Sequence, residues 1–347
     1  MNKVGLAMRA SIRVSTRVCL FGLLVAAGVA LAETAAGADA AEQARAPEAW
    51  LDEMNRAFRD LDYDGVFSYY GGSELATLRV VHMVVDGVQR ERLVHLNGAP
   101  REIIRTGDEV ACILHPGDEI LELEASIPAG PFARAFARRF DAVGDLYTIT
   151  LHGSDRIANR EAVRLAVAPR DDHRYGYRLW LDAATGLLLR SELRDMAGTK
   201  LEIFQFATLT VGDIPLSALD PVTRDGTATS HFWLNTPPPI RDASPMNWRA
   251  RWVPVGFSMA SADVRRTRAN LKVVNTLMFT DGLAAFSVYI EAMPPAGAGN
   301  LESRNGATVA VTHLAPGPSD RHHLVTVVGE VPTPTARKIA ESIYYER

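Results

Sequence analysis

The chain has 347 residues, of which 47% are hydrophobic, 22% are charged and 7% are aromatic, and its formal net charge is −4. The length indicates two domains rather than one, because single cores rarely grow beyond about 250–300 residues. An acidic chain with only four lysines excludes a dedicated nucleic-acid binder, whose phosphate contacts need clustered Lys and Arg. Two cysteines, Cys19 and Cys112, are too few for a disulfide framework or a zinc site.

Residues 1–32 are typical of a secretory signal peptide. Basic residues precede an uninterrupted apolar run of 14 residues, 18–31, and a small-residue end at Ala30-Leu31-Ala32. The run is shorter than the ~20 residues that span a bilayer, and a retained membrane anchor is the alternative. We expect cleavage after Ala32, which leaves 33 basic against 41 acidic residues, a net charge of −8.

The next segments predict one helix followed by an antiparallel sheet, over a first domain at 47–220. Pro47 suits the first turn of a helix that is expected to end near 63–65. Turn pairs such as Asp86-Gly87 and Asn97-Gly98 then recur about every ten residues. Such spacing leaves no room for crossover helices and predicts an antiparallel meander. Strands are expected at 78–85, 88–96, 101–105, 110–114, 120–123, 147–151, 163–167, 177–181, 187–193 and 201–206.

One part of this sheet is apolar on both faces. Strand 78–85 carries apolar residues at successive positions, among them Val81 and Met83, so both of its sides must be covered. Phe132, Phe136 and Phe140 lie at i, i+4 and i+8 and predict a helix over 131–140 with one aromatic stripe. Two interpretations stay open: the helix seals a dry core, or it lines an apolar ligand groove together with Val81 and Met83.

A proline-rich stretch at 221–245 predicts an extended linker to a second domain at 246–347. The second domain is expected to contain a hairpin over 271–291, strands at 307–314 and 323–329, and a closing helix. Thr333 is the expected helix cap, with Pro334 at the first helical position. The predicted fold class is therefore α+β in both domains.

No common catalytic motif occurs in the chain, which indicates a binding protein without a cofactor or a catalytic metal rather than an enzyme. The P-loop, the nucleophile elbow, the zinc-binding helix and the dinucleotide fingerprint are all missing from the sequence. Arg265, Arg266 and Arg268 form a basic cluster in an acidic chain, either as solvated surface or as a docking site for an acidic segment or an anionic headgroup. Trp252 and Phe257 would supply apolar anchors beside that cluster.

Several segments resemble the RseB/MucB family of periplasmic sigma-E regulators, in the family's order and over nearly the whole chain after residue 46. They are REIIRTGDEV at 101–110, YGYRLWLD at 175–182, LLRSEL at 188–193, WVPVGF at 252–257, DGL at 281–283 and VVGEVP at 327–332. The resemblance implies a first domain similar to the lipoprotein carriers, with a curved antiparallel sheet and helices against its concave face. It also implies a smaller second domain.

The resemblance further implies a periplasmic negative regulator that binds the periplasmic part of a single-span anti-sigma factor and shields it from proteolysis. A lipid, lipopolysaccharide or lipoprotein signal would relieve the shielding. We expect the second domain to carry most of the interface. A periplasmic lipid or lipoprotein carrier is the alternative function, and formation of a homodimer stays open.

Overall fold

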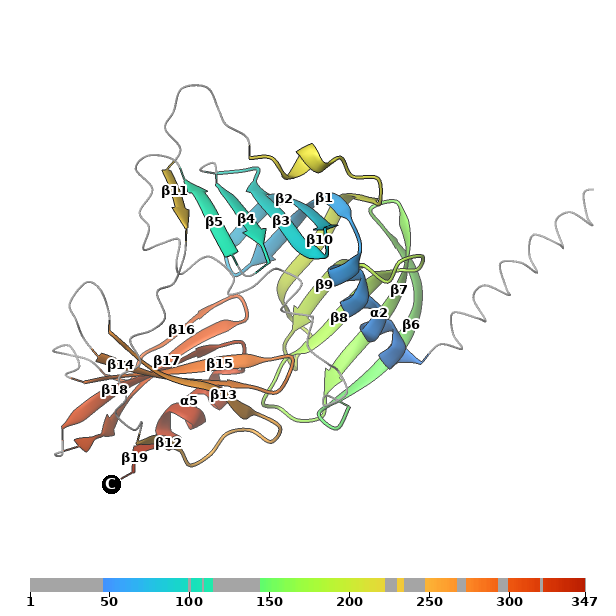
Figure 1. Cartoon of the computed structure of the whole chain (residues 1–347). Helices are drawn as coiled ribbons and strands as arrows, with labels where there is room; N and C mark the ends of the chain where they lie inside the picture. Colours follow the sequence, from blue (N-terminus) through green and yellow to red (C-terminus); the bar gives the residue numbers. More distant parts are fainter. Residues whose placement is uncertain are drawn as a thin grey trace, which may run out of the picture. The chain divides into compact units, whose positions relative to one another are not determined.

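The computed structural model describes residues 46–98, 101–107, 109–114, 144–221, 230–233, 247–266, 273–292, 299–318 and 321–346 (Figure 1). Residues Pro47–Arg347 form one compact unit. The expected signal peptide, the strand at 120–123 and the helix over 131–140 lie outside the described residues. No helix in the described ranges is long and apolar enough to cross a membrane.

The first domain is built on an antiparallel sheet that contains eleven strands within the described residues. Their order across the sheet is β11-β5-β4-β3-β2-β1-β10-β9-β8-β7-β6, so most neighbours in space are neighbours in sequence, as a meander requires. The strands are β1 (Tyr63–Gly71), β2 (Glu74–Val85), β3 (Val88–His95), β4 (Glu102–Thr106), β5 (Glu109–Leu114), β6 (Tyr147–Ile157), β7 (Arg160–Pro169), β8 (Gly176–Asp182), β9 (Leu188–Arg194), β10 (Lys200–Val211) and β11 (Ser230–Trp233).

The turn pairs within the described residues lie where the sequence predicted them. Asp86 and Gly87 have φ values of 52° and 75°, and Gly98, Gly186 and Gly198 also adopt positive φ. This left-handed conformation strains most residues and favours glycine, which is why the turn positions could be identified from sequence.

Strand β1 differs from the expectation. The predicted end of the first helix at 63–65 is instead the start of β1, and α2 (Pro47–Asp60) ends three residues earlier. β1 pairs with β2 on one side and with the distant β10 on the other. Asp64 and Gly65 favour a turn by local propensity, so the strand forms because long-range pairing outweighs that propensity.

Both faces of the sheet are covered near β2, as its two-sided apolar pattern requires. On one face α2 lies against the sheet (Figure 1). It packs Trp50, Leu51, Met54 and Phe58 into the main core of the domain. On the other face the 3₁₀ helix η2 (Leu216–Leu219) contacts β2 and β3.

Part of the predicted linker is a strand. Residues 230–233 form β11, which pairs antiparallel with β5 and extends the first sheet. Strand β5 would otherwise present unpaired backbone groups on this side, and a short added strand satisfies them. An Asp-Gly pair, Asp225-Gly226, precedes this strand, but the strand has only four residues and its partner β5 is distant in sequence, so the sequence pattern did not reveal it.

The second domain contains a six-stranded antiparallel sheet in the order β13-β14-β15-β18-β17-β16, and a two-stranded sheet of β12 and β19, within the described residues. The elements are β12 (Trp248–Ala250), β13 (Ser258–Arg266), β14 (Val273–Thr280), β15 (Ala285–Ala292), β16 (Glu302–Asn305), β17 (Thr308–Pro316), β18 (His322–Gly329), α5 (Thr333–Ser342) and β19 (Ile343–Tyr345). Helix α5 packs Ala336, Ile339 and Ala340 against the core of the larger sheet.

The expected cap of the closing helix was wrong by one position. Thr333 is the first helical residue, and Pro332 holds the cap position without a side-chain cap bond. The Pro332 carbonyl accepts the Ala336 N–H at 3.0 Å, and proline already has the extended backbone that a cap position needs.

Candidate functional site

The candidate site is a junction at which the loop between β7 and β8 meets three segments of the second domain. Its centre is Arg174, whose side chain is fully buried. The Arg174 guanidinium donates to both carboxylate oxygens of Asp171 at 3.0 and 2.9 Å and to the Val255 carbonyl at 2.6 Å. Its Nη1 atom donates to Asp281 Oδ2 at 2.7 Å, across 107 positions of sequence.

Asp281 lies in the turn between β14 and β15, and its side chain is fully buried as well. Its Oδ2 atom also accepts the Tyr147 hydroxyl at 3.0 Å, while Oδ1 accepts the N–H groups of Leu283 and Ala284 at 2.9 and 2.8 Å. Burial, followed by the charge of Asp281, raises the pKa of Tyr147, so this hydroxyl stays protonated and donates. The carboxylate thus joins the first domain to a turn of the second.

The charge of Arg174 is compensated from several sides. Burial lowers the pKa of Arg174, while Asp171 and Asp281 raise it, and the net shift is upward. The guanidinium also lies 5.6 Å from the ring centre of Tyr147 and 5.2 Å from that of Phe257. Buried ions are stable only when they are paired and fully hydrogen-bonded, and this arrangement meets that requirement.

Further contacts extend the junction along α5. His173 Nδ1 lies 3.1 Å from Thr335 Oγ1, and its ring packs edge-on against Trp252 with 5.2 Å between centres. Lys338 places its ammonium 3.8 Å from the centre of the Trp252 ring. The Tyr175 hydroxyl donates to the Val331 carbonyl at 3.1 Å, so the contact includes side chains and main chain of both domains.

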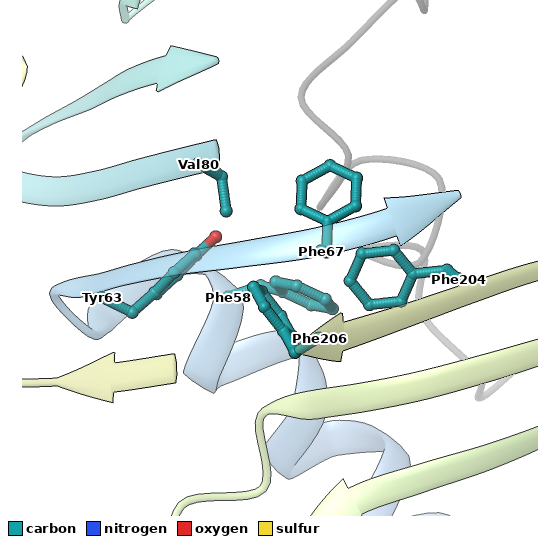
Figure 2. Close-up of a pocket in the computed structure, with 6 residues that line it drawn as sticks. All are labelled: Phe58, Tyr63, Phe67, Val80, Phe204 and Phe206. Carbon is teal, nitrogen blue, oxygen red and sulfur yellow. The ribbon is translucent and has the colours of Figure 1, made fainter. Parts of the chain in front are cut away.

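A separate apolar cavity lies between α2 and the first sheet (Figure 2). The volume open to a water-sized sphere inside it is about 10 Å³, room for about one water molecule and far below the ~300–1,000 Å³ of typical small-molecule pockets. The lining residues are Phe58, Tyr63, Phe67, Val80, Phe204 and Phe206. The rings of Phe67 and Phe204 lie 4.9 Å apart, and those of Phe204 and Phe206 lie 5.1 Å apart. The close ring contacts show that aromatic side chains fill most of this space.

The predicted groove residues are not brought together around this cavity. Val81 is fully buried, but adjacent strand residues point to opposite faces, and it is Val80 that lines the cavity. Met83 shares the face of Val81 and is also buried. Phe132, Phe136 and Phe140 lie outside the described residues.

Of the predicted partner-binding residues, two lie at the junction and the arginines lie at or beyond the end of β13. Trp252 and Phe257 both contact the junction, and Phe257 is 7% exposed. Arg265 and Arg266 end strand β13, and the structure describes their backbone; Arg268 lies outside the described residues.

Sequence reasoning missed Arg174 and Asp281 as a pair. Each lies in or beside a segment that carries the family resemblance, and that position is the one signal that could have indicated them. The described residues include no group of three or more His, Cys, Asp or Glu side chains that could hold a metal ion.

The two antiparallel sheets and the buried charged junction define a two-domain protein whose halves are tied by specific polar contacts. Models of the MucB/RseB N-terminal domain and the MucB/RseB C-terminal domain match residues 46–225 and 242–344. The chain therefore belongs to the MucB/RseB family.

Relatives and solved structures agree with this assignment. The sigma factor AlgU regulatory protein MucB of Pseudomonas aeruginosa is 35% identical over 316 residues, which cover 87% of this chain and 92% of the relative. The sigma-E factor regulatory protein RseB of Escherichia coli K12 is 27% identical over 303 residues, which cover 86% and 90%. The crystal structure of MucB in complex with MucA(peri) matches with a TM-score of 0.71 and 34% identity, over 87% of this chain and 100% of that one.

Proposed function

We propose that the protein is a periplasmic negative regulator of a sigma-E-type envelope stress response. It binds the periplasmic part of a membrane anti-sigma factor and shields that part from proteolysis. The observation that carries the proposal is the match of both domains to MucB as it occurs in its complex with MucA(peri). Export with cleavage after Ala32 belongs to the same proposal, because the partner segment lies in the periplasm.

Both domains contribute to binding, and the second contributes more. The surface beside the junction supports this assignment because Trp252 is partly buried under a lysine ammonium and Val255 is 79% exposed. Tryptophan is among the residues that are enriched at interface hot spots.

The test uses the chain from residue 33 onward and the periplasmic fragment of the cognate anti-sigma factor. Wild-type protein is expected to bind the fragment and to slow its cleavage by the first-site protease. Trp252→Ala is expected to weaken binding at least tenfold, within the range of a hot-spot aromatic. Tyr289→Ala, at a 37% exposed residue of β15, is the matched control and is expected to bind normally.

Absence of binding by the wild-type chain would overturn the regulator assignment. Normal affinity in Trp252→Ala would instead place the interface elsewhere. A chain that lacks 246–347 should lose most of its affinity for the fragment, and unchanged affinity would refute the assignment to the second domain.

The aromatic cavity supports a second candidate function, the carriage of an acyl chain by a lipoprotein-carrier-like first domain. At about 10 Å³ the cavity holds about one water molecule, so it can take an acyl chain only if α2 moves away from the sheet. Delipidated protein is expected to take up a fluorescent fatty acid, and Val80→Trp, which fills the cavity, is expected to reduce uptake. Equal uptake by both proteins would exclude this cavity as the acyl site.

A further inference from the structure

The face of the first sheet that is turned away from α2 carries a set of basic side chains. The registers pair Arg164 with Trp180 and Trp180 with Arg190, so the three lie side by side on β7, β8 and β9. Their neighbours Leu165 and Leu179 point to the opposite face and belong to the core under α2. We name this surface the basic face; it consists of Arg164, Arg178, Arg190, Arg194 and Lys200.

One buried carboxylate organises three of these cations. Glu192 forms ion pairs with Arg190, with Arg194 at 2.5 Å and with Lys200 at 2.9 Å. Burial raises the pKa of Glu192, but its contacts with Lys200, Arg194 and Arg190 outweigh burial and lower it to about 2. The carboxylate is therefore ionised at neutral pH, and three positive charges share a single negative charge.

The face keeps an excess of positive charge. Its five basic residues stand against Glu192 and Asp155, a local net charge of +3, whereas residues 33–347 together carry −8. Arg160 and Asp182, paired at 2.7 Å on the adjoining ends of β7 and β8, cancel each other. A positive region in an acidic protein produces a local field that favours an anionic partner.

Two of the basic side chains, Arg190 and Arg164, are held by specific contacts. Arg190 lies 4.8 Å from the centre of the Trp180 ring and donates to Gln205 Oε1 at 2.7 Å. Arg164 donates to the His152 carbonyl at 2.6 Å. Because the cations come from four adjacent strands, they spread over roughly 15 Å of an open sheet surface.

We propose that the basic face docks on the surface of a membrane that contains anionic phospholipid. Cations spread over one sheet face can contact several phosphates of a membrane surface at once, whereas an acidic peptide would meet such spread-out charges one at a time. Trp180 is only 8% exposed, so the contact is electrostatic and does not insert an apolar anchor. The proposal goes beyond the binding of an anti-sigma factor, because it needs no protein partner.

The test measures co-sedimentation of residues 33–347 with vesicles made of equal parts phosphatidylglycerol and phosphatidylcholine, and with phosphatidylcholine vesicles alone, at low salt. Each basic residue near an anionic surface contributes roughly fivefold in affinity, so R178A/K200A is expected to bind about twentyfold more weakly than wild type. R56A/R337A removes two exposed, ion-paired arginines away from this face and is the control of equal net charge. It is expected to bind within about twofold of wild type.

Binding should require phosphatidylglycerol and should be lost in about 1 M salt, where the Debye length is about 3 Å. No binding of wild type to the anionic vesicles, or an equal loss in both double variants, would overturn the proposal. Loss of anti-sigma fragment binding in R178A/K200A, without vesicle binding by wild type, would also overturn it and would place an acidic protein segment on this face. Failure of vesicle binding leaves the proposed function intact, since the anti-sigma fragment is assayed in solution.

Discussion

Asp281→Asn tests whether the buried pair holds the two domains together. The amide has the shape of the carboxylate, and its oxygen can still accept the N–H groups of the β14–β15 turn. The amide lacks the negative charge that faces Arg174 at 2.7 Å. Its NH₂ group would face the Arg174 guanidinium or the Tyr147 hydroxyl, which are themselves hydrogen-bond donors. Because both side chains are fully buried, removal of one charge leaves the other poorly compensated, which typically costs about 3–5 kcal/mol. Arg174 keeps Asp171, so we expect the lower end, about 3 kcal/mol.

The assay is urea-induced unfolding of residues 33–347, followed by tryptophan fluorescence and circular dichroism. Glu302→Gln is the matched control, since Glu302 forms a similar two-bond pair with Arg337 but both partners are largely exposed. That change is expected to cost much less than Asp281→Asn and to lose its effect at high salt, because water and ions screen an exposed pair. The effect of Asp281→Asn should persist at high salt. A loss below about 1 kcal/mol, or one that salt removes, would refute the junction as a main source of stability.

Two further outcomes follow from described contacts and a third from the basic cluster in the sequence. Gly72→Ala should destabilise the fold more than Gly87→Ala, although both residues have positive φ. An added Cβ at Gly72 would lie 2.8 Å from the backbone of the second domain, whereas at Gly87 no atom lies within 4 Å. Equal losses of stability in urea unfolding would contradict this contact. Burial, and then a neighbouring carboxylate, raise the pKa of Glu330 to about 7, above its unfolded value. The contribution of Glu330 to stability should therefore be fully present below about pH 4.5 and be lost as the pH rises through about 7. Glu330→Gln should flatten that part of a pH series of melting temperatures. Reversal of Arg265 and Arg266 to Glu should weaken binding of the anti-sigma fragment chiefly at low salt, and equal affinity would assign both to solvated surface.

The sheet could be predicted where its signals are local. Glycine at positive φ is required by the tight turn itself, so Gly87 and Gly98 located the strands on either side of them. β1 and β11 escaped prediction because each is stabilised by a partner that is distant in sequence. The junction could not be predicted for the same reason. A single arginine forms no repeating pattern, and no residue near Arg174 indicates that its partner Asp281 lies 107 residues away.

Four of the six segments that carry the family resemblance share a location rather than a chemistry. Tyr175 contacts the Val331 carbonyl, Asp281 accepts from Arg174, and Val255 supplies a carbonyl to the same guanidinium. Four segments that look unrelated in sequence thus meet at one junction, which explains why none of them resembles a catalytic motif. A regulator that binds one partner with two domains gains affinity from both only if the two domains are held in the orientation that lets them contact the partner at the same time. These four segments therefore indicate how the two domains are joined, and the proposed partner surface beside the junction would depend on that joint.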